Sequence, residues 1–144
     1  MFLVWIGFSS RFTFLSDSLQ YYYWIKFYFS GILSGEYPLW NPFYAWGCLD
    51  NFDMRFMGEF NPFFYLIVVL YKIGFSFYDS VRVYSMLYYW IGCVGFYCLA
   101  KSFFREFRWA FLSYLLILFS SIGFTIVFQL QVLLLFVPSI WFLY

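Results

Sequence analysis

The chain has 144 residues, of which 65% are hydrophobic and 10% charged, and its mean hydropathy is +0.80. A soluble domain carries about 25% charged residues, so a chain this apolar has too few polar groups to cover a water-facing surface, and we predict an integral membrane protein. The net charge of +1 argues neither for nor against nucleic acid, but no basic run suggests it, so we predict no nucleic-acid partner. Histidine is absent, which excludes histidine general bases, histidine-containing triads and histidine-ligated metals from this chain.

The first segment, residues 1–15, is mostly apolar but is interrupted by Arg11. A helix needs about 20 apolar residues to cross a membrane, and this segment lacks the basic start and the small-residue cleavage site of a signal peptide. We therefore interpret residues 1–15 as a truncated first transmembrane helix, and the chain as an N-terminal fragment.

Two helices are predicted in the region that follows. Residues 17–33 have helix-compatible spacing that stops at Ser34 and Gly35. Residues 36–61 contain several Pro and Gly residues and are predicted to form an ordered loop with little regular structure. Residues 62–74 are apolar but too few to span, so we predict an interfacial or re-entrant helix that lies on the outer face of the membrane.

Three apolar segments make up most of the remaining chain. Residues 80–100 and 109–127 are each long enough to cross about 30 Å of hydrocarbon. Residues 130–144 are equally apolar but shorter, because the chain ends there. We therefore predict that residues 80–144 form transmembrane helices.

The loop between the first two of these spans predicts their orientation. Its Lys101, Arg105 and Arg108 form the densest basic cluster of the chain, and short basic loops lie on the cytoplasmic side. Residues 16–79 are then external, which agrees with their excess of acidic side chains. The sequence thus predicts an all-α, polytopic transmembrane protein, with an external loop that carries juxtamembrane helices between its first and second spans.

Asp17 is the first candidate for a chemical role. It directly follows the predicted first helix, so its carboxylate would lie at the membrane surface, where acids are costly unless they bind or react. Its structural alternative is an N-cap of the helix at residues 17–33, with Gln20 three residues later completing a pair that resembles a capping box.

Asp50 and Asp53, with Asn51 between them, are weak candidates for a metal site. Carboxylate and amide oxygens are ligands for hard divalent cations. Two carboxylates three residues apart in a loop of this composition are more often turn formers, so we predict no metal site, although a divalent cation remains a possible cofactor.

Cationic and aromatic side chains of the outer region suggest how a ligand would bind. Three cationic side chains can pair with a lipid phosphate: Arg55, Lys72 and Arg82. Alternatively, they lie along the membrane surface with their charged groups in water, which is the commoner arrangement. Trp40 can stack on a sugar ring or anchor the loop at the headgroups.

Two amides, Gln129 and Gln131, stand at the start of the last apolar segment. Each can face a polar cavity or lie near the membrane interface.

The order of these features resembles that of bacterial YfhO-type membrane proteins. A first helix, an outer Asp-x-x-Gln helix, a Gly-Glu-Tyr-Pro-Leu-Trp-Asn-Pro loop and an outer helix that begins with proline follow one another. The chain is thereby also similar to the wider superfamily of polytopic glycosyltransferases that use lipid-linked sugars, the GT-C fold. The positions that carry the resemblance are Asp17, Gln20, Gly35, Pro38, Leu39, Trp40, Asn41, Pro42, Gly47 and Pro62.

The resemblance implies transfer of a sugar from a polyprenyl-phosphate donor to a cell-envelope acceptor, on the outer face of the bacterial cytoplasmic membrane. Phosphate is a competent leaving group, so such an enzyme needs a carboxylate base for the acceptor and cations for the phosphate. Asp17 would be the catalytic residue. The substrate-binding residues would be Gln20, Glu36, Trp40, Asn41, Arg55 and Arg82. Because such enzymes have many more helices and a soluble C-terminal domain, this chain alone is expected to be an incomplete catalyst.

A second reading is a non-catalytic polytopic membrane protein, a transport or scaffolding subunit with a structural outer loop. A transporter is expected to carry ionisable residues or broken helices near the middle of the membrane. Residues 80–100 and 109–127 are predicted to have neither at their centres. This expectation weakens the transport reading and leaves a scaffolding role open.

Overall fold

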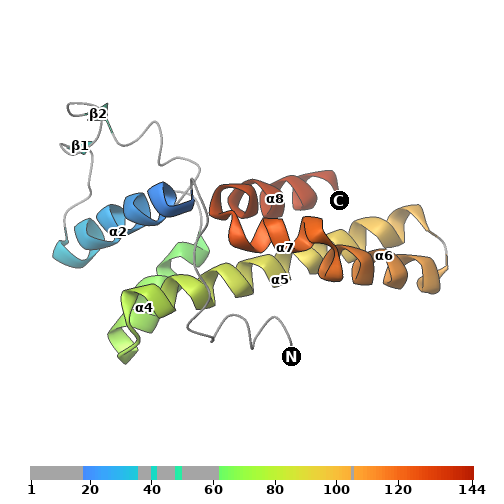
Figure 1. Cartoon of the computed structure of the whole chain (residues 1–144), viewed down its shortest axis with the longest axis horizontal. Coiled ribbons are helices and arrows are strands. Elements are labelled where there is room, and N and C mark those ends of the chain that lie inside the picture. Colours follow the sequence, from blue (N-terminus) through green and yellow to red (C-terminus); the bar gives the residue numbers. More distant parts are fainter. Residues whose placement is uncertain (1–17, 36–39, 42–47, 50–61, 105) are drawn as a thin grey trace. The chain divides into compact units, whose positions relative to one another are not determined.

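The structure is a computed structural model, and all structural statements refer to the residues that it describes: 18–35, 40–41, 48–49, 62–104 and 106–144. These residues are almost entirely helical (Figure 1), which confirms the prediction of an all-α protein. The exception is a short antiparallel ladder of β1 (Trp40–Asn41) and β2 (Cys48–Leu49), in which Trp40 pairs with Leu49. This ladder lies within the segment predicted to be a loop.

The chain divides into two compact units. One is Leu19–Tyr84, and the other contains Ser85–Tyr144. The long helix α5 (Phe77–Phe103) contributes its first residues to one unit and the rest to the other.

The unit Leu19–Tyr84 contains the two helices expected outside the membrane. Helix α2 covers Ser18–Ser34, where residues 17–33 were predicted. The 3-10 turn η1 (Pro62–Phe64) continues into α4 (Tyr65–Ile73), where residues 62–74 were predicted. Gly74 ends α4 in the left-handed region, at φ 113°, and its N–H donates to the Tyr71 carbonyl at 3.0 Å. Glycine adopts this conformation without steric cost, so the helix stops here.

Aromatic pairs hold these helices together. The Tyr28 ring lies 5.1 Å from that of Phe64, and the Phe29 ring lies 5.1 Å from Tyr71 and 4.8 Å from Phe77. Such pairs add about 0.5–1.5 kcal/mol each beyond the burial of their area. Helix α2 therefore packs on both α4 and the start of α5.

The unit that contains Ser85–Tyr144 is built around α5. With 27 residues, α5 is about 40 Å long, enough to cross about 30 Å of hydrocarbon. By length and composition, the described residues contain one helix able to cross a membrane, or two if the bent pair α6 (Phe107–Phe119) and α7 (Ser121–Phe128) forms one span. The last helix, α8 (Leu130–Leu143), is apolar but shorter and contains Pro138.

Contacts between rings and backbone set the direction of α6. The Tyr97 ring lies 6.3 Å from that of Phe107, near the start of α6, and the Tyr89 hydroxyl donates to the Ile117 carbonyl, near its end, at 3.4 Å. Contacts thus move backward along α5 as they move forward along α6. The two helices are antiparallel, as expected for neighbours joined by a short turn.

Small residues on α5 set the approach of α8. A Cβ on Gly92 would lie 2.6 Å from a ring atom of Phe136, and a Cβ on Gly95 would lie 3.0 Å from the Ile140 side chain. The later glycine of α5 meets the later residue of α8, so α8 runs parallel to α5. Glycine at these positions leaves room for the side chains of α8; small residues are common at the contacts between membrane helices.

The expectation that residues 109–127 carry no helix break near their centre is wrong. The helix stops at Phe119, Ser120 is extended at φ −78° and ψ 161°, and α7 leaves at an angle of 54° to α6. Through Tyr89, this break lies beside the middle of α5, which runs from Phe77 to Phe103. The absence of a broken helix therefore no longer counts against a transport role.

Side chains satisfy the backbone groups that the break releases. The Ile117 carbonyl accepts hydrogen bonds from the Ser120 hydroxyl at 3.3 Å and from the Tyr89 hydroxyl at 3.4 Å, and the Gly123 N–H donates to Ser120 Oγ at 3.1 Å. A helix can break inside a membrane when side chains replace the lost partners in this way. The bend is therefore a defined element of the fold.

Candidate functional site

The structure describes part of the predicted site. The predicted residues that lie outside its described ranges are Asp17, Glu36, Asp50, Asp53 and Arg55. Their roles stay predictions. Asp17 immediately precedes the first residue of α2, Ser18, which is the sequence position that the capping alternative requires.

Trp40 and Asn41 form β1, and they pair with Leu49 and Cys48. The ladder gives the Pro-Leu-Trp-Asn-Pro segment a regular backbone at its centre. Gln20 lies in the first turn of α2 and is exposed to solvent. Its amide is therefore accessible to a ligand.

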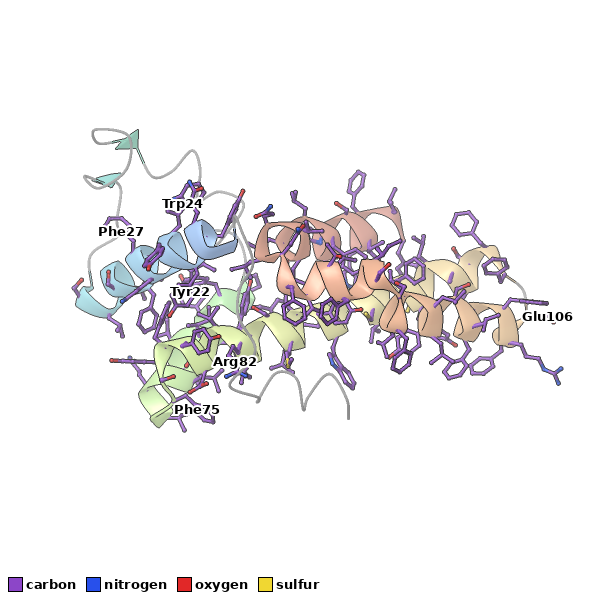
Figure 2. The ribbon with its side chains drawn as sticks, viewed as in Figure 1. Tyr22, Trp24, Phe27, Phe75, Arg82 and Glu106 are labelled. Carbon is purple, nitrogen blue, oxygen red and sulfur yellow. The ribbon has the colours of Figure 1, made fainter. Side chains whose placement is uncertain are left out.

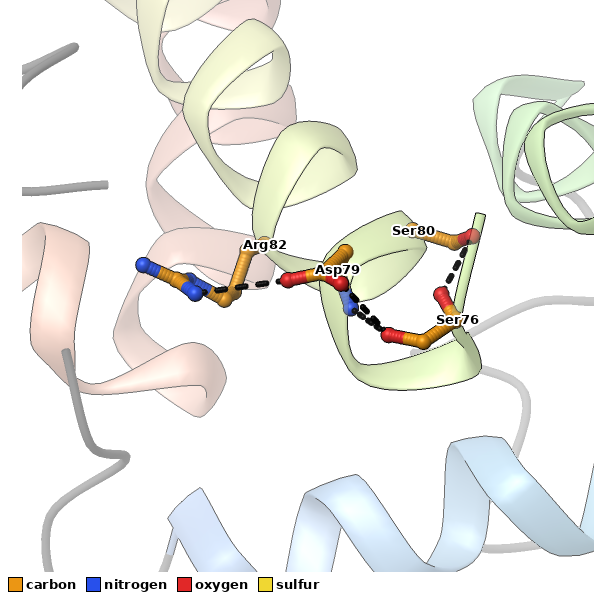
Figure 3. A network of polar contacts seen from close by, with 4 residues as sticks. All are labelled: Ser76, Asp79, Ser80 and Arg82. Carbon is orange, nitrogen blue, oxygen red and sulfur yellow. Dashed lines mark hydrogen bonds and ion pairs between the residues drawn. The ribbon is translucent and has the colours of Figure 1, made fainter. Parts of the chain in front are cut away.

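Arg82 belongs to a polar network at the start of α5 (Figure 3). The network begins at Ser76, just before the helix. Ser76 Oγ accepts a hydrogen bond from the Asp79 N–H at 3.1 Å and donates one to Asp79 Oδ2 at 2.6 Å. Ser80 Oγ donates to the Ser76 carbonyl at 2.9 Å. These contacts cap the helix and hold the Asp79 carboxylate in place.

The guanidinium of Arg82 is held from two sides. Its Nη1 lies 3.3 Å from Asp79 Oδ1, and its Cζ lies 5.3 Å from the centre of the Tyr78 ring, within cation–π range. The Arg82 side chain is 8% exposed, whereas that of Asp79 is 46% exposed. The acid faces solvent, and the cation is buried behind it.

This burial does not fit one of the two predicted roles of Arg82, that of a cation extended along the membrane surface. A side chain that extends along the surface toward water keeps its charged head exposed, and Arg82 does not. Lys72, in the last turn of α4, is exposed and fits that reading. A buried cation is costly unless it is paired, so Arg82 and Asp79 depend on each other.

Tyr22 brings α2 to the same cluster. Its ring lies 5.3 Å from Phe77 and 6.0 Å from Tyr78, on the side of α2 that faces α5 (Figure 2). Burial, and to a smaller extent the neighbouring phenols of Tyr78 and Tyr23, raises the pKa of Tyr22. Its hydroxyl therefore stays protonated at neutral pH and can donate a hydrogen bond.

Only the donor side of this cluster suits an anion, because Asp79 already balances the charge of Arg82. Arg82 is a permanent cation with a planar fork of donors suited to phosphate. The Asp79 carboxylate already accepts from Ser76 and Arg82, so it is poorly placed to act as a general base. Among the described residues, no group of three or more His, Cys, Asp or Glu side chains could hold a metal ion.

Sequence reasoning identified Arg82 but missed Ser76 and Asp79. The signal was present, because Ser76-x-x-Asp79 before an apolar run has the spacing of a capping box. What the sequence did not contain was the burial of Arg82, which depends on the helices packed around it.

The amides at the start of α8 lie at a second break. Gln129 is extended, at φ −104° and ψ 96°, and separates α7 from α8. Gln131 Oε1 is buried and accepts no hydrogen bond from the described residues. Gln131 as a whole is half-buried, so both predicted roles, facing a polar cavity and lying near the interface, stay open.

A search among known protein families, curated proteins and solved structures finds no match to this chain. The described part of the molecule is therefore characterised by its structure alone. It is an all-α chain with one or two helices that can cross a membrane, and it carries a buried arginine near the beginning of the longer one.

Proposed function

We propose that this chain is part of a membrane glycosyltransferase-like protein of the YfhO type. The protein would transfer a sugar from a polyprenyl-phosphate donor to an acceptor on the outer face of a bacterial membrane. The observation that carries the proposal is Arg82, a buried arginine held by Asp79 and Tyr78 near the start of the long helix α5.

The depth of Arg82 supports a lipid phosphate as its ligand. If α5, about 40 Å long, is centred on a hydrocarbon core of about 30 Å, each end extends about 5 Å beyond it. Arg82 lies five residues after Phe77, where α5 begins, or about 7.5 Å along the axis. The guanidinium would then stand near the boundary between headgroups and hydrocarbon.

The arrangement of α2 supports a role for Asp17 in the same reaction. Tyr22, in the second turn of α2, touches the Tyr78 ring, and Tyr78 supports Arg82. The start of the helix that follows Asp17 in the sequence is therefore packed on the arginine cluster. In this mechanism Asp17 removes the proton of the acceptor, and Arg82 stabilises the charge on the departing phosphate.

Sugar transfer in membranes that contain the full-length protein tests the proposal. With a labelled polyprenyl-phosphate sugar, we expect Asp17→Asn to lower the rate about 10²- to 10⁴-fold, as is typical when a general base is lost. We expect Arg82→Gln to cost about 10²-fold or more, as for a transition-state donor. The matched control is Lys72→Gln, which removes an exposed cation from α4 and should leave the rate unchanged. Wild-type rates for Asp17→Asn and Arg82→Gln at normal protein levels would refute the proposal.

A transport subunit is the second candidate, because of the break between α6 and α7. Substrates and coupling ions of transporters bind at discontinuous helices near the bilayer middle, and this break lies beside the middle of α5. Solute uptake by vesicles that fails on Gly123→Ala but is indifferent to Asp17→Asn would favour transport over sugar transfer.

A further inference from the structure

The turn between α5 and α6 exposes aromatic and basic side chains together. Phe103 is 76%, Phe107 61% and Trp109 56% exposed. Lys101 and Arg108 are exposed beside them. Aromatic rings mixed with basic heads are typical of the zone where a protein meets lipid headgroups.

Two grooves share an aromatic wall on α6. The wall consists of the Phe107 and Phe111 rings, which are stacked at 5.7 Å with an angle of 9° between their planes. The groove toward α5 has a volume of about 290 Å³ and is lined, besides the wall, by Val94, Tyr97 and Tyr114. The other groove has a volume of about 500 Å³ and is lined, besides the wall, by Glu106, Arg108, Trp109, Leu112 and Leu115.

The larger groove is charged at one end and apolar along the rest, which matches the headgroup and acyl chain of a lipid. Its two charged residues, Glu106 (Figure 2) and Arg108, stand at the beginning of α6, and the lining then becomes apolar as far as Leu115. Phe107, Phe111 and Leu115 repeat every four residues and so share one face of the helix. This stripe rises about 12 Å along the axis, close to the roughly 15 Å of hydrocarbon in one leaflet.

The charges favour an anionic lipid. Residues 101–108 contain three bases and one acid, which attracts anionic headgroups. Within the part of the chain that the structure describes, Arg108 and Glu106 form no ion pair with each other. The Glu106 carboxylate lines the same groove and repels an anion there. Glu106 and Arg108 therefore have opposite effects on the binding of an anionic headgroup.

We propose that this groove binds one anionic phospholipid from the leaflet that surrounds the α5–α6 turn. The lipid phosphate lies at Arg108, and one acyl chain lies along Phe107, Phe111 and Leu115. The site is separate from the Arg82 cluster and does not depend on sugar transfer.

Quenching of Trp109 by lipids brominated in their acyl chains tests the site. The full chain is reconstituted into phosphatidylcholine vesicles in which either phosphatidylglycerol or an equal fraction of phosphatidylcholine carries the bromine. Because the chain has seven tryptophans, the Trp109 signal is the difference between the wild type and Trp109→Phe. We expect phosphatidylglycerol to quench Trp109 with an apparent affinity about five-fold above that of phosphatidylcholine, in line with one basic residue acting on an anionic lipid.

Three variants distinguish a site from general attraction by positive charge. Arg108→Gln should abolish the preference for phosphatidylglycerol, and Glu106→Gln should increase it. Lys101→Gln makes the same charge change in the same turn but outside the groove, and should retain most of the preference. Equal quenching by the two lipids in the wild type overturns the proposal, as does a loss for Lys101→Gln as large as that for Arg108→Gln.

Discussion

Gly123→Ala is the sharpest test of the bend between α6 and α7. A Cβ on Gly123 would lie 1.8 Å from the carbonyl oxygen of Ile117, far inside the 3.0 Å below which such contacts essentially never occur. The obstacle is backbone and cannot rotate away. To accept alanine, the bend must open by more than 1 Å, which breaks the hydrogen bond from Gly123 to Ser120 and the one from Tyr89 to Ile117.

The expected cost follows from these contacts. Overpacking costs about 1–3 kcal/mol, and each lost hydrogen bond costs about 0.5–1.5 kcal/mol. Alanine recovers up to about 1 kcal/mol as the better helix former. We therefore expect Gly123→Ala to lower the free energy of unfolding by about 2–4 kcal/mol, or about 30- to 1,000-fold in the equilibrium constant.

Reversible unfolding in mixed micelles, followed by the helical circular dichroism signal, measures this change. Gly95→Ala is the matched control, because its Cβ would meet only side chains, at 3.0 Å, and its cost should stay within about 1 kcal/mol. Spin labels at the exposed positions Leu112 and Thr125, in a background without native cysteines, report the bend. If Gly123→Ala keeps both wild-type stability and the wild-type label distance, this account of the bend is wrong.

Three further outcomes are expected. Ser76→Ala should lower the free energy of unfolding by about 0.5–2 kcal/mol, measured by the same titration, because it removes the N-cap of α5; an unchanged midpoint would contradict the capping role. Tyr22 has a folded-state pKa above its ordinary value of 10.0, so its contribution to stability is complete below pH 10 and is lost as pH rises through the folded pKa. Tyr22→Phe should therefore lessen the alkaline loss of stability above pH 10, and an identical loss would exclude Tyr22 as its source. In intact cells, Cys48 should react with a membrane-impermeant thiol reagent if residues 16–79 are external, whereas protection until lysis would reverse the orientation.

The sequence by itself determined the helical elements well, because their signals are local. A long apolar run predicts a helix over residues 80–100, and α5 covers Phe77–Phe103. The Ser34-Gly35 pair predicts the end of a helix, and α2 ends at Ser34. Apolar run length and helix-stopping residues act within a few positions of each other, so no tertiary information is needed to read them.

The Arg82 cluster was predicted only in part. The sequence marked Arg82 as a possible phosphate ligand but left open whether its head reaches solvent. Burial was decided by packing, since the Tyr78 ring beneath Arg82 is itself touched by Tyr22 of α2. Residues more than 50 positions apart in the chain meet there, and no local pattern encodes such a contact.

The break in the second apolar segment was decided by tertiary structure alone. Composition makes residues 109–127 look like one span, and Ser120, Ser121 and Gly123 are all tolerated in membrane helices. The helix breaks where Tyr89, 28 residues away, supplies a hydroxyl to the Ile117 carbonyl, and where Gly123 admits that carbonyl against its backbone. A helix gives up its own hydrogen bonds inside a bilayer when partners from elsewhere in the fold replace them, and those partners become neighbours only once the chain has folded.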